Sequence, residues 1–193
     1  MPKKEDSKKT KEELIKEVEE LRERVKELKN PIDEVTGLYR WIHFLNLAER
    51  EFDRSRRFKR PMSVILLDIN NLKKIYADYS EKCVDQILLE VSKRCNDNIR
   101  DLDYIGCYED STFILLLLET NKLDAKRVGN RLRKVIASRP VSTEKGPIKV
   151  TVSIGIAEKD TEMTDISSLL EKADEALFLA KDQVPNRFKT TSN

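Results

Sequence analysis

The sequence has few of the residues that build disulfide frameworks, histidine-based metal sites or membrane spans. Its three cysteines, Cys83, Cys95 and Cys107, are odd in number and form no CxxC pair. This usage favours a reducing compartment and predicts a cytoplasmic protein. The single histidine, His43, argues against a histidine-based metal site or catalytic triad. No run of about 18 apolar residues occurs and the N-terminus lacks the apolar core of a signal peptide, so we expect no membrane partner.

The charge balance gives little reason to expect a nucleic acid as partner. Lys and Arg number 37 against 35 Asp and Glu, which leaves a formal net charge of +2. The basic run RSRRFKR at 54–60 is one local exception that can touch nucleic acid, but we interpret it as the solvated end of a helix. We therefore expect no nucleic-acid binding.

The first thirty residues differ from the rest in composition. Residues 1–12 are polar and lysine-rich, and we predict a disordered basic tail there. Residues 13–30 carry a 4, 3, 4, 3 spacing of apolar residues, which places Val at a and Leu at d of a heptad. The pattern predicts a coiled-coil helix and a parallel homodimer; the alternative is an amphipathic helix that lies on its own domain. The stripe consists of Leu14, Val18, Leu21, Val25 and Leu28.

Residues 31–190 are predicted to form one α+β domain. Apolar periodicity indicates a helix after Pro31 and helices around 84–95, 125–136 and 166–177. The first is predicted to place Ile42, Leu45, Ala48 and Phe52 on one face, and the last is marked by Ile166, Leu169, Leu170, Ala173 and Leu177. Strands are expected at MSVILLDIN (62–70), near 104–108 and near 113–118, and at IKVTVSIGI (148–156), whose alternation predicts one buried face. The order predicts an α/β sandwich, with a central, mostly antiparallel sheet flanked by helices.

One pair of strands carries the candidate chemistry. Asp68 lies at the carboxyl end of the first strand, and the hairpin between residues 108 and 113 should lie beside it. Palm-type nucleotidyl sites hold Mg²⁺ between a strand-end carboxylate and another from an adjacent hairpin. Such tips usually carry Gly or Asn, since the favoured turns need positive φ; here Glu109 and Asp110 stand at the tip, followed by Ser111 and Thr112.

Several separate motifs resemble those of the GGDEF domain, the diguanylate cyclase domain that makes cyclic di-GMP from two GTP. DEVTGLYR at 33–40, LLDINNLKKI at 66–75 and ADEALFLAK at 173–181 resemble the entry, strand and closing motifs of that family. The resemblance runs from Asp33 to about Phe188 and implies the palm-like fold. Phe113 falls on the last residue of the GGDEF signature, which here is EDSTF.

Set against the family, the active site is only partly present. The resemblance implies that Asp68 is a metal ligand, that Lys73 and Lys181 contact phosphates, and that Asp85 contacts guanine. At other positions this chain lacks the residue that carries the family's role. Glu109 and Asp110 replace the two glycines, Ser111 the metal-binding acid, Thr112 the catalytic glutamate and Tyr76 the guanine-binding asparagine. Because a lone Asp68 cannot hold Mg²⁺ productively, we predict a vestigial site, no required metal or cofactor, and no enzymatic activity.

A second family site is retained in sequence. Arg100 and Asp103 form RxxD at the spacing of the inhibitory site, or I-site, where the resemblance implies that cyclic di-GMP binds. Arg131 matches the family's second arginine. An arginine fork can donate to the O6 and N7 edge of guanine while a carboxylate accepts from N1 and N2. The simpler interpretations are a surface ion pair, a helix-capping role for Asp103, or an inherited site no longer used.

These features leave three hypotheses for function. The first is a catalytically inactive cyclic di-GMP receptor that signals through rearrangement of a dimer or of an unknown protein partner. The second is a protein-interaction scaffold that needs no nucleotide. The third, a weaker one, keeps GTP as a ligand that is not hydrolysed, at Lys73, Asp85 and Lys181.

Overall fold

The computed structural model describes residues 10–183 and 188–190, and the chain divides into two compact units, residues 1–31 and 32–193. Most of the segment predicted to be a disordered tail lies outside the described residues. In the described part of the first unit the chain forms one helix, α1 (Lys11–Lys29). Its N-terminus is closed by a capping box, in which the Glu13 N–H donates to Thr10 Oγ1 (3.3 Å) and the Thr10 N–H to Glu13 Oε2 (2.7 Å).

The apolar stripe of α1 consists of exposed residues. Leu14, Val18, Leu21 and Val25 are all exposed, with exposed fractions of 39–53%. The side chain of Leu28, the last member predicted for the stripe, lies outside the described side chains. A helix that presents four aliphatic side chains on one face can bury them against another copy, another protein or its own second unit.

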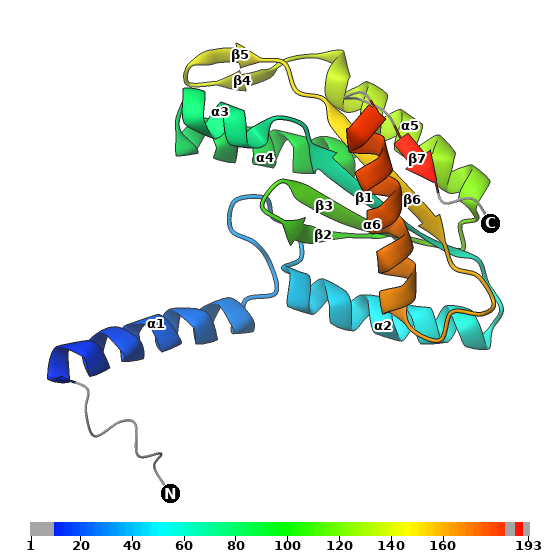
Figure 1. Ribbon diagram of the computed structural model, residues 1–193, viewed down its shortest axis with the longest axis horizontal. Coiled ribbons are helices and arrows are strands. Elements are labelled where there is room, and N and C mark those ends of the chain that lie inside the picture. Colours follow the sequence, from blue (N-terminus) through cyan, green and yellow to red (C-terminus); the bar gives the residue numbers. More distant parts are fainter. Residues whose placement is uncertain (1–9, 184–187, 191–193) are drawn as a thin grey trace, which may run out of the picture. The chain divides into compact units, whose positions relative to one another are not determined.

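The second unit contains a sheet, helices on both of its faces and a small separate hairpin (Figure 1). The helices are α2 (Trp41–Arg57), α3 (Leu72–Asp78), α4 (Glu81–Asn96), α5 (Lys122–Ser138) and α6 (Ile166–Gln183). The strands are β1 (Met62–Ile69), β2 (Tyr104–Glu109), β3 (Thr112–Leu118), β4 (Val141–Thr143), β5 (Gly146–Ile148), β6 (Val152–Glu158) and β7 (Phe188–Thr190).

The main sheet has the order β2-β3-β1-β6-β7. The pairs β2–β3, β3–β1 and β1–β6 are antiparallel, and β6–β7 is parallel. The fold is therefore the palm-like α/β sandwich with a mostly antiparallel sheet, as predicted. Strand β1 pairs on both sides, Asp68 opposite Thr112 on one and Ser153 on the other, so the candidate carboxylate lies in the middle of the sheet.

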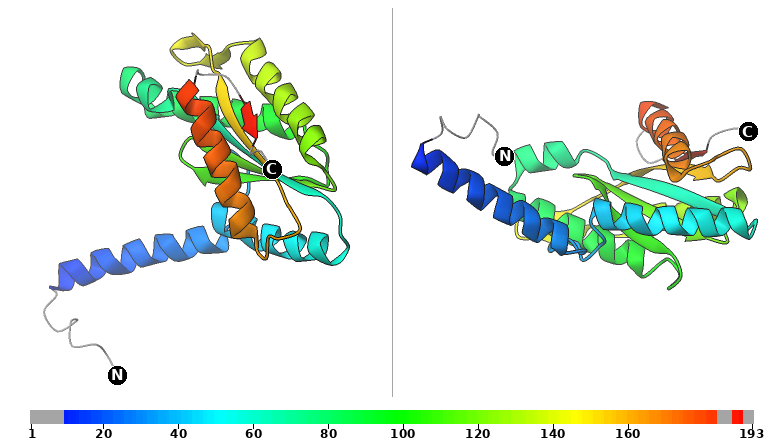
Figure 2. Two further views of the ribbon diagram at one scale, coloured as in Figure 1. Left: turned by 45° about the vertical axis from the view of Figure 1, so that its right-hand side comes forward. Right: turned by 90° about the horizontal axis from the view of Figure 1, so that it is seen from below.

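Helices lie on both faces of the sheet (Figure 2), and alternation along the strands divides the interior into two cores. Ile65, Leu67 and Ile69 of β1 face the layer made by α4 and α5. Met62, Val64 and Leu66 face the layer made by α2 and α6. Because Asp68 continues the second series, its carboxylate points to the α6 side of the sheet.

The strand predicted at 148–156 differs from the structure in extent and burial. Residues 146–148 form β5, paired with β4 in the small hairpin, and the long strand β6 begins only at Val152. Six of its seven residues are buried, so both faces are covered rather than one. The α6 backbone lies directly on β6: a Cβ added at Gly155 would lie 2.3 Å from the Ala173 carbonyl oxygen, and only glycine fits there.

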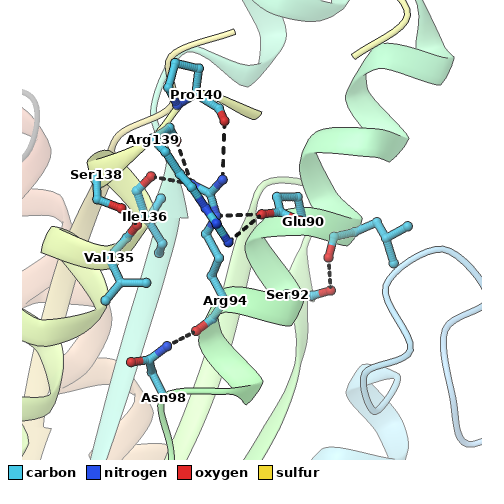
Figure 3. Close-up of polar contacts among 10 residues, drawn as sticks. Glu90, Ser92, Arg94, Asn98, Val135, Ile136, Ser138, Arg139 and Pro140 are labelled. Atoms are coloured by element: carbon cyan, nitrogen blue, oxygen red, sulfur yellow. Dashed lines mark hydrogen bonds and ion pairs between the residues drawn. The ribbon is translucent and has the colours of Figure 1, made fainter. Parts of the chain in front are cut away.

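A buried arginine joins α4 to the end of α5 (Figure 3). Arg94 is 4% exposed; its Nη1 donates to the carbonyls of Ile136 (2.7 Å) and Arg139 (2.8 Å). Its Nε donates to Glu90 Oε1 at 2.8 Å. The last carbonyls of a helix have no hydrogen-bond donor within the helix. Arg94 supplies such a donor to carbonyls at the end of α5.

Candidate functional site

The hairpin tip between β2 and β3 is a two-residue turn. Glu109 pairs with Thr112, which leaves Asp110 and Ser111 at the tip, and the register shifts by a bulge between Cys107 and Glu109. None of these four turn residues has a positive φ, although a positive φ occurs elsewhere, as at Asn71. The backbone of this turn therefore does not require glycine. The Ile69 N–H donates to the Ser111 carbonyl at 2.9 Å, which holds the tip against the end of β1.

One oxygen of the Asp68 carboxylate is engaged by three neighbouring side chains. Its Oδ2 accepts hydrogen bonds from Ser111 Oγ (2.8 Å) and Thr112 Oγ1 (2.9 Å). Lys181 Nζ, from α6, lies 2.9 Å from the same oxygen. Asp68 is 6% exposed, so its charge is neutralised by this lysine and two hydroxyls, as a nearly buried carboxylate requires.

This arrangement does not fit a catalytic Mg²⁺. Magnesium takes oxygen ligands and usually a pair of carboxylates or one with substrate phosphates, whereas here an ammonium group stands beside the single acid. The two positions that face Asp68 from the hairpin, Ser111 and Thr112, supply hydroxyl donors instead of carboxylate ligands. Across the part of the chain that the structure describes, no three His, Cys, Asp or Glu side chains are grouped to hold a metal ion.

The structure brings the remaining predicted active-site residues around two adjoining hollows. The smaller, of about 570 Å³, lies over Asp68 and Lys181. The larger, of about 690 Å³, includes Tyr76 and Asp85. Both are bordered by Lys73, Glu109, Asp110 and Ser111. Thr112 is buried at 1% exposure beneath them.

Sequence reasoning missed the contribution of the segment that leads into α2. Asp33, Arg40 and Trp41 line the larger hollow, and Tyr108 completes that wall from β2. Trp41 meets Tyr108 edge to face, with ring centroids 5.0 Å apart. The motif DEVTGLYR identified this segment as part of the family resemblance, but nothing in its periodicity indicated that it reaches the hairpin.

The second predicted constellation is also assembled. Asp103 Oδ2 accepts the Arg100 N–H (3.2 Å) and Oδ1 accepts the Leu118 N–H (3.1 Å), so this carboxylate anchors the turn to β3. Arg131 of α5 reaches the same segment, where its Nη2 donates to the Asn98 carbonyl at 2.6 Å. Burial raises the pKa of Asp103, while its two backbone hydrogen bonds and the positive charges of Arg100 and Arg131 act in the opposite direction.

The guanidinium of Arg100 is available to a ligand. No ion pair joins it to Asp103 and no side-chain hydrogen bond of Arg100 occurs within residues 10–183 and 188–190. The arginine is exposed. Of the simpler interpretations, the surface ion pair is absent, whereas Asp103 does have a structural role in its turn. Each of its oxygens accepts one backbone bond and has a lone pair left for a further donor.

A palm-like sheet with an acid at the end of its central strand and a hairpin beside it defines the class of nucleotidyl cyclase-like domains. The profile of the diguanylate cyclase, GGDEF domain family matches residues 30–187, and the chain belongs to this family. It is 30% identical over 157 residues to the diguanylate cyclase DosC of Escherichia coli K12, covering 81% of this chain and 34% of DosC. The chain thus spans about a third of the length of this curated relative.

Solved structures show the same fold. The GGDEF domain of DgcB from Caulobacter crescentus in complex with c-di-GMP superimposes with a TM-score of 0.80 at 19% identity, covering 84% of this chain and 94% of that one. Diguanylate cyclase SiaD in complex with its activator SiaC, from Pseudomonas aeruginosa, gives 0.79 at 25% identity, covering 92% and 68%. Among the residues described here, no helix is both long and apolar enough to cross a bilayer.

Proposed function

We propose that this chain is a catalytically inactive GGDEF-family protein that binds cyclic di-GMP through Arg100, Asp103 and Arg131. The observation that carries the proposal is the contrast between its two family sites. At the catalytic site, Asp68 is neutralised by Lys181 and faces hydroxyls. At the second site, two arginines flank one carboxylate, and the Arg100 guanidinium has no side-chain partner in the described chain.

The chemistry of the second site suits a guanine base. Arg100 presents a planar fork that can donate twice to O6 and N7, and Asp103 can accept from N1 and N2. Because two backbone N–H groups orient the Asp103 carboxylate, the acceptor is held in place before the ligand arrives. Arg131 adds a second cation on α5, suited to the phosphates or to the other base.

We expect the purified chain to bind cyclic di-GMP saturably. An Arg100→Ala variant should bind at least about 30-fold more weakly, because the charged donor to the guanine base is lost. Isothermal titration calorimetry measures both, after the protein has been freed of any co-purified nucleotide. Arg57→Ala is the matched control: it removes another exposed arginine, at the end of α2, and should bind as the unchanged protein does.

The same titration separates the alternatives. Equal binding by Arg100→Ala would place the ligand elsewhere and contradict the proposed site. No binding by nucleotide-free protein would leave the nucleotide-independent scaffold as the better account. Binding of GTP in place of cyclic di-GMP would favour the vestigial site, although Lys181, one of its three expected contacts, is already paired with Asp68.

The output of ligand binding is proposed to pass through a homodimer. The exposed stripe Leu14, Val18, Leu21 and Val25 has the heptad spacing of a parallel two-stranded coiled coil. Two domains joined in this way present two cyclic di-GMP sites at a high effective concentration. Ligand binding would then change which surface the dimer offers to a protein partner.

Leu21→Lys in the full chain is expected to abolish this dimer, because it places a charge at a central d position of a short coiled coil. Multi-angle light scattering at micromolar concentration should give about twice the 22.5 kDa chain mass for the unchanged protein and the single chain mass for the variant. Lys16→Glu, an exposed change outside the stripe, should leave the mass unchanged. A monomeric unchanged protein would refute the dimer.

A further inference from the structure

The larger hollow of the site is well formed and has the size of a small-molecule cavity. Its volume of about 690 Å³ lies within the range of about 300–1,000 Å³ typical of ligand sites. The walls come from the segment before α2, from α3 and α4, and from the β2–β3 hairpin. The cavity lies wholly within residues 32–193, the second compact unit.

Much of the lining is apolar and aromatic. Trp41 and Tyr108 meet edge to face, and the Tyr108 hydroxyl donates to Asp174 Oδ2 at 2.5 Å, which fixes the ring. Tyr76, at 57% exposure, stands on α3 with its ring largely free of the protein interior. The aliphatic part of the lining consists of Val35, Leu72, Val84 and Leu88. Such walls favour a ligand with a flat apolar body.

The charged part of the lining is strongly negative. Five carboxylates border the cavity, from Asp33, Glu81, Asp85, Glu109 and Asp110, against the cations of Arg40 and Lys73. Arg40 is already paired with Asp33: its Nη1 lies 3.7 Å from Asp33 Oδ2, and its Nε donates to the Ile32 carbonyl. Lys73 alone therefore opposes the remaining four acids.

Those four acids have no partner of their own. Within the described chain, no side-chain hydrogen bond or ion pair is made by Glu81, Asp85, Glu109 or Asp110. Asp85 is half-buried. Unpaired carboxylates beside apolar walls repel a triphosphate and attract a cation, and the field in such a cleft is stronger than on an open surface. Aromatic faces reinforce that preference.

We propose that this cavity binds an organic cation that carries a flat apolar or aromatic body, with the cationic head between Asp85 and the hairpin acids and the body against Trp41 and Tyr76. The acids Glu109 and Asp110, which stand where the family has two glycines, would in this way favour a cationic ligand in place of an anionic nucleotide. The cation site shares no residue with Arg100, Asp103 and Arg131, so either site can fail without the other.

The test uses benzamidinium and benzamide, two probes of the same shape that differ in charge. Trp41 is the only tryptophan and lines the cavity, so its emission reports occupancy directly. Benzamidinium is expected to change this emission saturably in the millimolar range or tighter, with benzamide at least 10-fold weaker. The double variant Asp85→Asn/Glu109→Gln should weaken benzamidinium at least 10-fold.

Controls separate a local site from general attraction. Glu49→Gln/Glu175→Gln removes two exposed carboxylates outside this cavity and should bind benzamidinium as the unchanged chain does. Arg100→Ala should also leave benzamidinium binding unchanged, whatever it does to cyclic di-GMP. Equal responses to the two probes, equal loss in both double variants, or no saturable response to benzamidinium would each overturn the proposal.

Discussion

Incubated with GTP and Mg²⁺, the protein is expected to make cyclic di-GMP at least about 1,000-fold more slowly than an active GGDEF-family enzyme assayed beside it. The loss of one stabilising group at a catalytic centre costs about 100- to 1,000-fold in rate, and the proposed function implies that several are missing together. The Asp68 carboxylate contacts Ser111, Thr112 and Lys181, and none of these three side chains is a second acid. Chromatography of the nucleotides after a long incubation measures the product.

A variant of the β2–β3 hairpin tests whether its residues are the reason for the low rate expected. Glu109→Gly/Asp110→Gly/Ser111→Asp/Thr112→Glu restores the family signature, and we expect it to gain Mg²⁺-dependent GTP binding in calorimetry. Full activity is not expected, because Tyr76 still occupies the position of the guanine-binding asparagine. Steady formation of cyclic di-GMP by the unchanged protein, in proportion to enzyme concentration, would contradict the inactive reading of the site.

Arg94→Met is expected to lower the free energy of unfolding by about 3 kcal/mol, because it removes a buried, charged donor that makes several hydrogen bonds. Methionine fills much of the space, but the Ile136 and Arg139 carbonyls lose their shared donor and Glu90 loses its nearest cation. The end of α5 and the start of the β4–β5 hairpin are then tied less firmly to α4. Urea denaturation followed by circular dichroism gives the free-energy difference.

Lys93→Met is the matched control, because it replaces a long cationic side chain at the neighbouring, exposed position of α4. It should change the free energy of unfolding by less than about 0.5 kcal/mol, as surface substitutions usually do. If Arg94→Met were as stable as Lys93→Met, the hydrogen bonds of Arg94 would contribute nothing net to the fold. Cyclic di-GMP binding by the Arg94→Met variant at low temperature would show that only stability has changed.

Apolar periodicity predicted the strands and helices of the second unit well where a single helical or strand pattern was clear. The apolar run at Met62–Ile69 is the buried central strand, and the positions predicted on α6 are all buried. The prediction of extent and burial failed where the sequence pattern does not show a strand boundary or the second covering layer. Residues 148–156 alternate without a break, yet the chain forms a short β5 first, and both faces of β6 are covered because α5 and α6 pack on opposite sides. In α2 the predicted face included Ile42, which is 43% exposed, whereas Phe44 is buried.

By itself the sequence determined the α+β order, the heptad stripe of α1, the EDSTF turn and the family to which the chain belongs. It did so because local periodicity and motif spacing are properties of neighbouring residues. Only the tertiary structure decided which partners each site residue has. Lys181 and Asp68 are 113 positions apart, and their contact depends on α6 crossing the end of β1. The cavity's four unpaired acids likewise come from two separate segments, α4 and the β2–β3 hairpin, and only the packing of these segments gives the cavity its charge.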